Sequence, residues 1–224
     1  MAGGLEIEVK LKVGELVDAP ERLTATKIRL EEMGATISHP REFEDNLAFD
    51  FPDRSIVRAG SLLRVRVLAR GTLLTFKGPA APALAGLMSG GASQAAGTSA
   101  TAPTPATAHA PVKARHETEL MIPSNETDAL LAIIRGLGMQ PVFQYQKYRT
   151  TWEWQGLHVL LDETPIGIYL ELEGDRALIE AGAQALGYRS GDFITKSYRD
   201  LYLEQLDQRA QGLQGSRSAD RMLF

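Results

Sequence analysis

The chain has 224 residues, 44% hydrophobic and 23% charged, a composition typical of a globular protein that excludes a wholly disordered or fibrous chain. A net charge of −4 gives no support to non-specific nucleic-acid binding, and the lack of cysteine excludes disulfides and cysteine-ligated zinc. Because there is no secretory signal and no hydrophobic run long enough to span a bilayer, we expect a cytoplasmic protein with neither a membrane nor a nucleic-acid partner.

Strands alternate with helices along the chain. Residues 5–13 switch between hydrophobic and charged side chains with a period of two, which is typical of a strand with one buried face. In chain order we expect strands at 5–13, 43–51, 62–69, 72–77, 112–122, 142–154, 157–163 and 166–173, and helices at 18–33, 124–137, 175–186 and 197–209. This order predicts the α+β class.

One long segment differs from the rest in composition. Residues 79–111 consist largely of Ala, Gly, Pro, Ser and Thr, and such a sequence buries too little surface to offset its ordering entropy. We therefore expect a disordered insertion at 79–111 within a single domain that spans 1–207, with a partner-binding linker as the alternative. The polar residues 208–224 are expected to form a flexible tail.

Charged residues recur at every second position of the expected strands. They are Glu6, Glu8 and Lys10; Arg64 and Arg66; Lys77; Lys113, Arg115, Glu117 and Glu119; Lys147 and Arg149; Asp162; Glu171 and Glu173. Residues two apart project from the same face of a strand, so each group shares a face opposite hydrophobic residues. A solvated sheet face is one interpretation. Because the pattern extends over nearly every strand, we favour an eight-stranded closed barrel with a charged interior, enclosing one small ligand, and with helices packed outside.

The mixture of charges indicates the ligand. Arg and Lys bind phosphate oxygens, whereas carboxylates repel a polyphosphate unless a cation lies between them. Mg²⁺ and Mn²⁺ prefer such oxygen ligands. A metal–polyphosphate site is therefore the chemistry that this pattern predicts. The histidines show no metal-ligand spacing: His39 is expected in a loop and His158 on an outer face or in a turn, while Trp152 and Trp154 are expected to pack on the barrel surface.

The segment from Glu6 to Lys10 resembles the E-x-E-x-K signature of the CYTH superfamily, the triphosphate tunnel metalloenzymes, which include class IV adenylate cyclases, thiamine triphosphatases and inorganic triphosphatases. Later segments resemble further family motifs in order, at 63–66, 75–78, 115–119, 147–149, 162–163, 167–173 and 196–198. The resemblance covers about residues 5–206 and implies an eight-stranded antiparallel tunnel.

The resemblance also implies roles for individual residues. The metal set, for one or two Mg²⁺ or Mn²⁺ ions, is Glu6, Glu8, Glu117, Glu119, Asp162, Glu171 and Glu173. The triphosphate-binding set is Lys10, Arg64, Arg66, Lys77, Arg115, Lys147, Arg149 and Lys196. The catalytic set is Glu6, Glu8, Lys10 and Lys77. Glu117 and Glu119 are either second-site ligands or partners of the basic residues, and the chain could pair as a homodimer.

Two reactions are compatible with these parts. In hydrolysis, water attacks the terminal phosphorus of inorganic triphosphate, thiamine triphosphate or a nucleoside triphosphate; in cyclisation, the ribose 3′-oxygen of ATP attacks the α-phosphorus and pyrophosphate leaves. No His-Phe element of the kind seen in some cyclases precedes Glu6, which favours hydrolysis, although residues 42–51 resemble the bacterial cyclase-like branch. A non-catalytic polyphosphate or nucleotide sensor is the third alternative.

Overall fold

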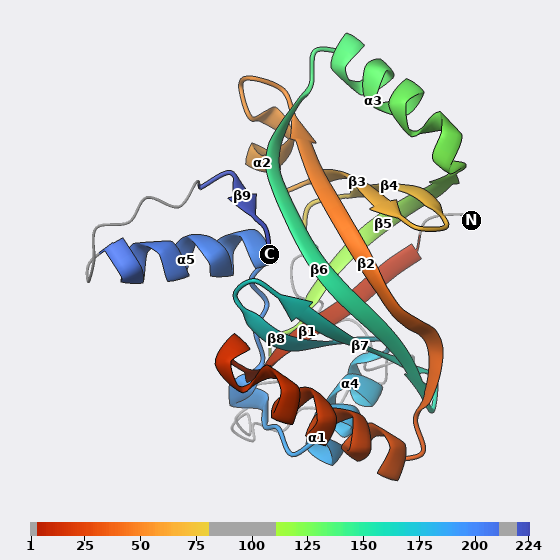
Figure 1. Ribbon diagram of the computed structural model, residues 1–224, viewed down its shortest axis with the longest axis vertical. Helices are drawn as coiled ribbons and strands as arrows, with labels where there is room; N and C mark the ends of the chain where they lie inside the picture. The colour runs from red at the N-terminus through yellow and green to blue at the C-terminus, as the bar shows by residue number, and fades with distance from the viewer. Residues whose placement is uncertain (1–3, 81–110, 211–218) are drawn as a thin grey trace, which may run out of the picture.

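Strands wound around a common centre, with helices on the outside, make up the computed structural model, which describes residues 4–80, 111–210 and 219–224 (Figure 1). The strands are β1 (Gly4–Gly14), β2 (Thr36–Asp50), β3 (Leu62–Leu68), β4 (Gly71–Lys77), β5 (Lys113–Ile122), β6 (Gln140–Trp154), β7 (Leu157–Thr164), β8 (Gly167–Glu173) and β9 (Arg221–Met222). The helices are α1 (Ala19–Glu32), α2 (Ser55–Arg58), α3 (Thr127–Gly136), α4 (Arg176–Ala185) and α5 (Tyr198–Ala210), with 3-10 turns at Leu16–Asp18, Ser124–Glu126 and Ser190–Asp192. None of the described helices is both long and hydrophobic enough to cross a membrane.

The first eight strands form a closed barrel. Their order is β2-β3-β4-β5-β1-β8-β7-β6, and pairing between β2 and β6 joins the two ends. Every pairing among these eight strands is antiparallel. The predicted eight-stranded antiparallel barrel with helices outside is therefore confirmed.

The outer face of β1, β7 and β8 is covered by two helices. Val9 and Leu11 of β1 are fully buried against Leu30 of α1 and Ile179 of α4, and Figure 1 shows these helices beneath the three strands. Each such side chain contributes about 1.5–3 kcal/mol relative to an exposed one. Trp152, which was predicted to pack on the barrel surface, belongs to the same cluster. The period-two pattern therefore sends the charged residues inward.

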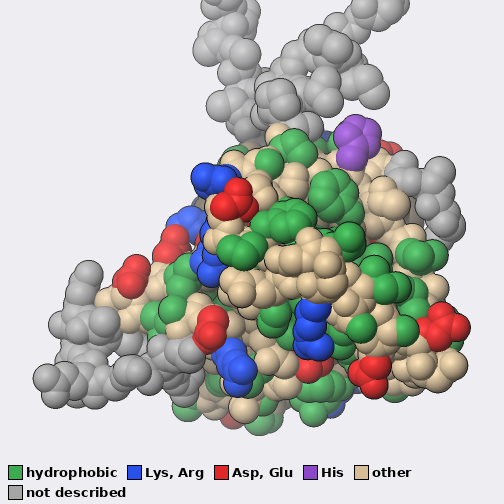
Figure 2. All heavy atoms as spheres, turned by 90° about the horizontal axis from the view of Figure 1, so that it is seen from above, with side chains coloured by type: hydrophobic (Ala, Val, Ile, Leu, Met, Phe, Trp, Pro, Cys, Tyr) green, Lys and Arg blue, Asp and Glu red, His purple; other side chains and the backbone are tan. Residues whose placement is uncertain are grey.

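The other helices cover different parts of the barrel. Ile134 of α3 packs on Val65 of β3 and Phe49 of β2. The start of α5 contacts inward-facing aromatic residues instead, with Tyr198 packed near Phe143 and Tyr169, and the helix then extends away from the barrel (Figure 1). Viewed from the side that carries α3, the surface shows many hydrophobic side chains and only scattered charged ones (Figure 2).

The structure differs from the sequence prediction at three places. Strand β2 begins at Thr36 and includes His39, because irregular pairing between His39 and Glu42 accommodates Pro40 within the strand. Helix α2 was not predicted. Residues 219–224, which were expected to belong to a flexible tail, are packed on the barrel instead: Met222 is buried, and β9 pairs in parallel with β6. The predicted insertion, apart from residues 79, 80 and 111, lies outside the described residues.

Candidate functional site

The barrel encloses a cavity of about 580 Å³ that is lined by side chains from all eight strands. Nearly all of the charged residues predicted for the site line it: Glu6, Glu8, Lys10, Arg64, Arg66, Lys77, Arg115, Glu117, Glu119, Lys147, Arg149, Glu171 and Glu173. Strand pairing explains the convergence, since Lys77 lies opposite Glu117 and Glu8 lies opposite Glu173. Residues far apart in the sequence therefore face one space.

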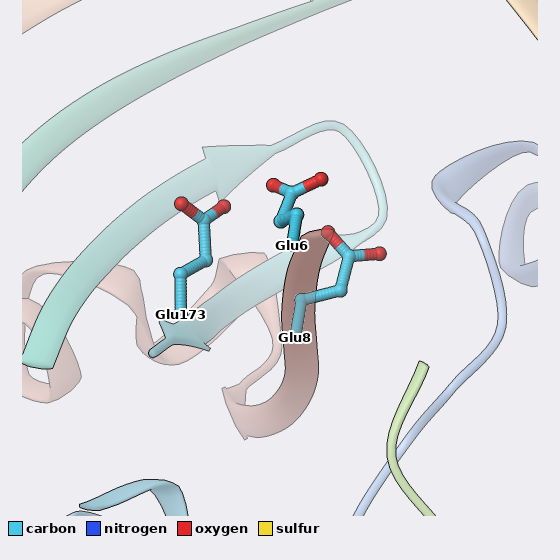
Figure 3. Close-up of side chains that lie close together, drawn as sticks. All are labelled: Glu6, Glu8 and Glu173. Atoms are coloured by element: carbon cyan, nitrogen blue, oxygen red, sulfur yellow. The ribbon is translucent and has the colours of Figure 1, made fainter. Parts of the chain in front are cut away.

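Three carboxyl groups meet on one side of this cavity. Glu6 and Glu8 come from β1 and Glu173 from β8, and one oxygen from each lies within 4.8 Å of the others. Figure 3 shows the three side chains rising from adjacent strands with their carboxyl groups close together. A cluster of oxygen ligands at this spacing suits a hard divalent cation such as Mg²⁺ or Mn²⁺.

The members of this cluster differ in their charge environment. Burial, reinforced by nearby Glu6 and opposed by Arg149, raises the pKa of Glu173 to about 7. Burial also works against the ionisation of Glu8, but the charges of Lys10 and other lysines lower its pKa to about 2. The carboxyl group of Glu8 is thus firmly ionised, whereas that of Glu173 loses its proton near neutral pH. A cation would favour the ionised form of both.

A further carboxyl group adjoins the cluster. Burial and a hydrogen bond with Glu6 raise the pKa of Glu117 to about 8. Although burial opposes the ionisation of Glu6, that hydrogen bond and the charge of Lys77 lower its pKa. These opposite shifts favour a proton on Glu117 over one on Glu6. This surplus of carboxyl groups fits a site for a divalent cation, because a bound cation would displace the proton and neutralise the repulsion between the carboxylates.

Basic residues line the cavity beside the carboxyl groups. Lys77 Nζ lies 3.0 Å from a carboxyl oxygen of Glu117 and 3.8 Å from one of Glu8. Arg64 Nη1 donates to Tyr145 Oη at 3.3 Å, and its Nη2 donates to Thr75 Oγ1 at 3.2 Å. These contacts fix the lysine and the guanidinium within the cavity.

Two arginines retain unused hydrogen-bond donors. Within the described part of the chain, the buried Nε atoms of Arg64 and Arg115 have no hydrogen-bond partner. Both residues line the cavity. Buried donors are normally satisfied, so each of these nitrogens needs an acceptor that the protein does not supply. Phosphate oxygens are acceptors that guanidinium groups bind well.

Asp162 joins the ion-pair network of the cavity through Lys147 and Arg149. It is fully buried and accepts hydrogen bonds from Lys147 Nζ at 2.9 Å, Arg149 Nε at 2.6 Å and Tyr198 Oη at 2.7 Å. Asp162 is absent from the cavity lining. Asp162 thus holds Lys147 and Arg149 in position, and its place in the metal set remains a prediction.

Lys196 also departs from the predicted site. Its Nζ lies 2.6 Å from Glu204 Oε1 of α5, both side chains are about half exposed, and Lys196 is not part of the cavity lining. Its neighbours Thr195 and Ser197 do line the cavity. The backbone thus directs alternate residues inward here and sends Lys196 outward, and its contact with a triphosphate remains a prediction.

The structure adds residues that the motifs did not single out. Glu44 is buried on β2, with Oε2 3.3 Å from Arg66 Nε and 3.5 Å from Lys147 Nζ. His158 lines the cavity rather than facing outward, and its Nδ1 lies 2.9 Å from Glu153 Oε2. The period-two spacing of Glu42, Glu44 and Asn46 was the available signal for the acidic residue on β2.

Comparisons with known proteins agree with this arrangement. A family model described as the CYTH domain matches residues 4–198. Among curated proteins, no relative matches the sequence. A candidate adenylate cyclase from Vibrio parahaemolyticus has a similar structure, with a TM-score of 0.66, 16% identity and coverage of 90% of this chain and 99% of that one.

Two further solved structures share the fold. The PH1819 protein from Pyrococcus horikoshii is 20% identical with a TM-score of 0.61, covering 89% of this chain and 99% of that one. HpAC1 from Hippeastrum, a candidate adenylyl cyclase with a dominant triphosphatase activity, is 15% identical with a TM-score of 0.56, covering 89% of this chain and 96% of that one. The closed barrel, its charged interior and the family match over most of the sequence together show that the chain belongs to the CYTH domain family.

Proposed function

We propose that this protein is a divalent-cation-dependent enzyme that binds a triphosphate inside the barrel and hydrolyses its terminal phosphoryl group. One observation carries the proposal: the Glu6, Glu8 and Glu173 cluster shares a single cavity with several cationic side chains. A site for simple anions does not need converging carboxylates, whereas a cation–polyphosphate complex has use for both charges.

The acidic and the basic residues of the cavity have different roles in this proposal. Glu6, Glu8 and Glu173 would hold the cation, with Glu117 beside them as a proton-bearing neighbour. When bound, Mg²⁺ or Mn²⁺ supplies Lewis-acid neutralisation of phosphoryl charge. Arg64 and Arg115 bind phosphate oxygens through donors that are otherwise unused.

The remaining network keeps these groups in place. Lys10 Nζ lies 3.1 Å from Glu171 Oε1 and 3.5 Å from Glu8 Oε1, so it orients carboxylates on two strands. Asp162 fixes Arg149 through two hydrogen bonds, which holds the guanidinium at the cavity wall. Such preorganised charge lowers the barrier because little rearrangement is needed as charge moves from the terminal phosphorus to the leaving oxygen. Water adds to that phosphorus and loses a proton to solvent, the P–O–P bond breaks, and orthophosphate and the shortened phosphate are released.

Hydrolysis is preferred over cyclisation. The dominant triphosphatase activity of HpAC1, a candidate cyclase of the same fold, supports this choice. Reaction at a terminal phosphoryl group also requires only the polyphosphate chain, which the basic residues of this cavity can bind.

Product analysis tests the proposal. Purified protein is incubated with inorganic triphosphate, thiamine triphosphate and ATP, each with Mg²⁺, with Mn²⁺ or with chelator. We expect cation-dependent release of orthophosphate, which Glu6→Ala abolishes and the surface control Glu32→Ala preserves. Cyclic AMP with pyrophosphate would identify a cyclase instead. Tight binding without turnover would identify a sensor.

A further inference from the structure

A second cavity of about 260 Å³ lies beside the main one. Six residues line both cavities: Ala48, Val57, Ser61, Leu62, Phe143 and Arg199. The two spaces are therefore neighbours with common walls, and we call the smaller one the side pocket.

The side pocket adjoins one end of the basic residues. Ala48 lies opposite Arg64 in the β2–β3 pairing and opposite Phe143 in the β2–β6 pairing. Ala48 is also the smallest inward-facing residue in the series of Glu44, Asn46 and Ala48 on β2. Its short side chain leaves room where its neighbours fill the barrel. An organic group attached to a triphosphate bound at Arg64 would meet this wall.

The lining of the side pocket combines hydrophobic walls with positive charge. Phe49, Ile56 and Val142 contribute hydrophobic surface, and Arg54 and Arg199 contribute two guanidinium groups. Among the described residues, neither guanidinium has an ion-pair or hydrogen-bond partner on the protein. The donors of both arginines are thus available to a ligand.

The one carboxylate that the described residues contribute to the side pocket is already satisfied. Asp50 is almost fully buried and accepts hydrogen bonds from the backbone N–H groups of Phe51, Ile56 and Val57. It holds the loop that leads into α2 rather than facing an arginine. The groups that remain for recognition are donors and cations.

We propose that the side pocket binds the organic group of the substrate, and that this group is a neutral, acceptor-rich aromatic ring such as a nucleobase rather than a cationic ring such as that of thiamine. Guanidinium groups donate to acceptor atoms on base edges and stack on aromatic faces, whereas they repel a positively charged ring. The inference rests on the proposed binding of a triphosphate, and it narrows the substrate class to nucleoside triphosphates.

Diphosphates provide stable probes, because they lack the terminal group that the enzyme is proposed to remove. Dissociation constants of GDP, thiamine diphosphate and pyrophosphate are measured by titration calorimetry with Mg²⁺, for the wild type and for Arg54→Ala and Arg199→Ala. Arg58→Ala is the matched control, since Arg58 lies on α2, pairs with Asp53 at 3.0 Å and lines neither cavity.

We expect GDP to bind at least about tenfold more tightly than thiamine diphosphate. We also expect each side-pocket variant to reduce the preference for GDP over pyrophosphate by about tenfold, and the control to keep it. Equal affinities for the two organic diphosphates, an unchanged preference in both variants, or no measurable GDP binding would overturn the inference. The expected preferences without turnover of any triphosphate would instead contradict the proposed hydrolase and leave the side pocket established. Turnover of a triphosphate together with unaltered binding preferences in the side-pocket variants would overturn the side-pocket inference and leave the proposed hydrolase standing.

Discussion

Glu171 and Glu173 lie two residues apart on β8 and face the same cavity, yet the same amide substitution should change stability in opposite directions. Glu171 lies 3.1 Å from Lys10 and contacts Arg149, and although burial opposes its ionisation, these cations hold its pKa well below the ordinary value. Among the described residues, no cation lies within ion-pair distance of Glu173, whose pKa is raised to about 7.

The structure sets the size of each effect. At pH 8 without metal, the rise in the pKa of Glu173 from 4.5 to about 7 corresponds to an ionisation penalty on the order of 3 kcal/mol at most. Glu173→Gln removes that penalty, so it should stabilise the metal-free protein by about 1–3 kcal/mol. Glu171→Gln removes the partner that Lys10 and Arg149 share, while Lys10 keeps Glu8 and Arg149 keeps Asp162, so the loss of the charged hydrogen bonds should cost about 1.5–3 kcal/mol.

Urea unfolding at pH 8 in chelator measures both changes, and titration with Mn²⁺ measures metal binding. Although Glu173→Gln should stabilise the fold, it should weaken Mn²⁺ binding by at least about tenfold, because an amide is a poorer ligand than a carboxylate. The reasoning is refuted if both variants lose stability alike, or if Glu173→Gln binds Mn²⁺ as tightly as the wild type.

Three further predictions concern the same cavity. Mn²⁺ affinity should rise between pH 6 and pH 8.5, because the pKa of Glu173 is raised to about 7 and that of Glu117 to about 8. Below those values protons compete with the cation. Calorimetry measures the affinity at each pH, and an affinity independent of pH would contradict this prediction. Arg115→Ala should weaken tripolyphosphate binding about ten- to hundredfold, whereas Lys196→Ala should change it less than about twofold, and equal losses would contradict the placement of these residues. Deletion of residues 82–108 should leave the rate of tripolyphosphate hydrolysis within about twofold of the wild type, because loop length has a small effect on closure entropy and β4 pairs directly with β5; a collapsed rate with normal melting would show that the segment acts in catalysis.

The barrel could be predicted because its strands carry a strong local signal. Charged and hydrophobic residues alternate in β1 so regularly that one face must be buried under helices and the other must face inward. Each strand repeats this rule independently, so the sequence specifies which face Glu6, Arg64 and Glu171 occupy without any knowledge of pairing.

The depth of each residue in the barrel could not be predicted in the same way. Asp162 follows the inward pattern, but Lys147, Arg149 and Tyr198 cover its carboxylate, so it does not line the cavity. Lys196 belongs to a segment outside the barrel strands, where no alternation indicates direction. The role of Arg199 depends on where the start of α5 packs on the barrel, which is a tertiary contact without a sequence period.

Anomalous scattering from a crystal grown with Mn²⁺ and tripolyphosphate tests the central claim most directly. We expect a manganese peak among the carboxyl groups of Glu6, Glu8 and Glu173, with phosphate oxygens bound by Arg64 and Arg115 in the same cavity. Manganese and tripolyphosphate bound only outside the barrel would contradict the account.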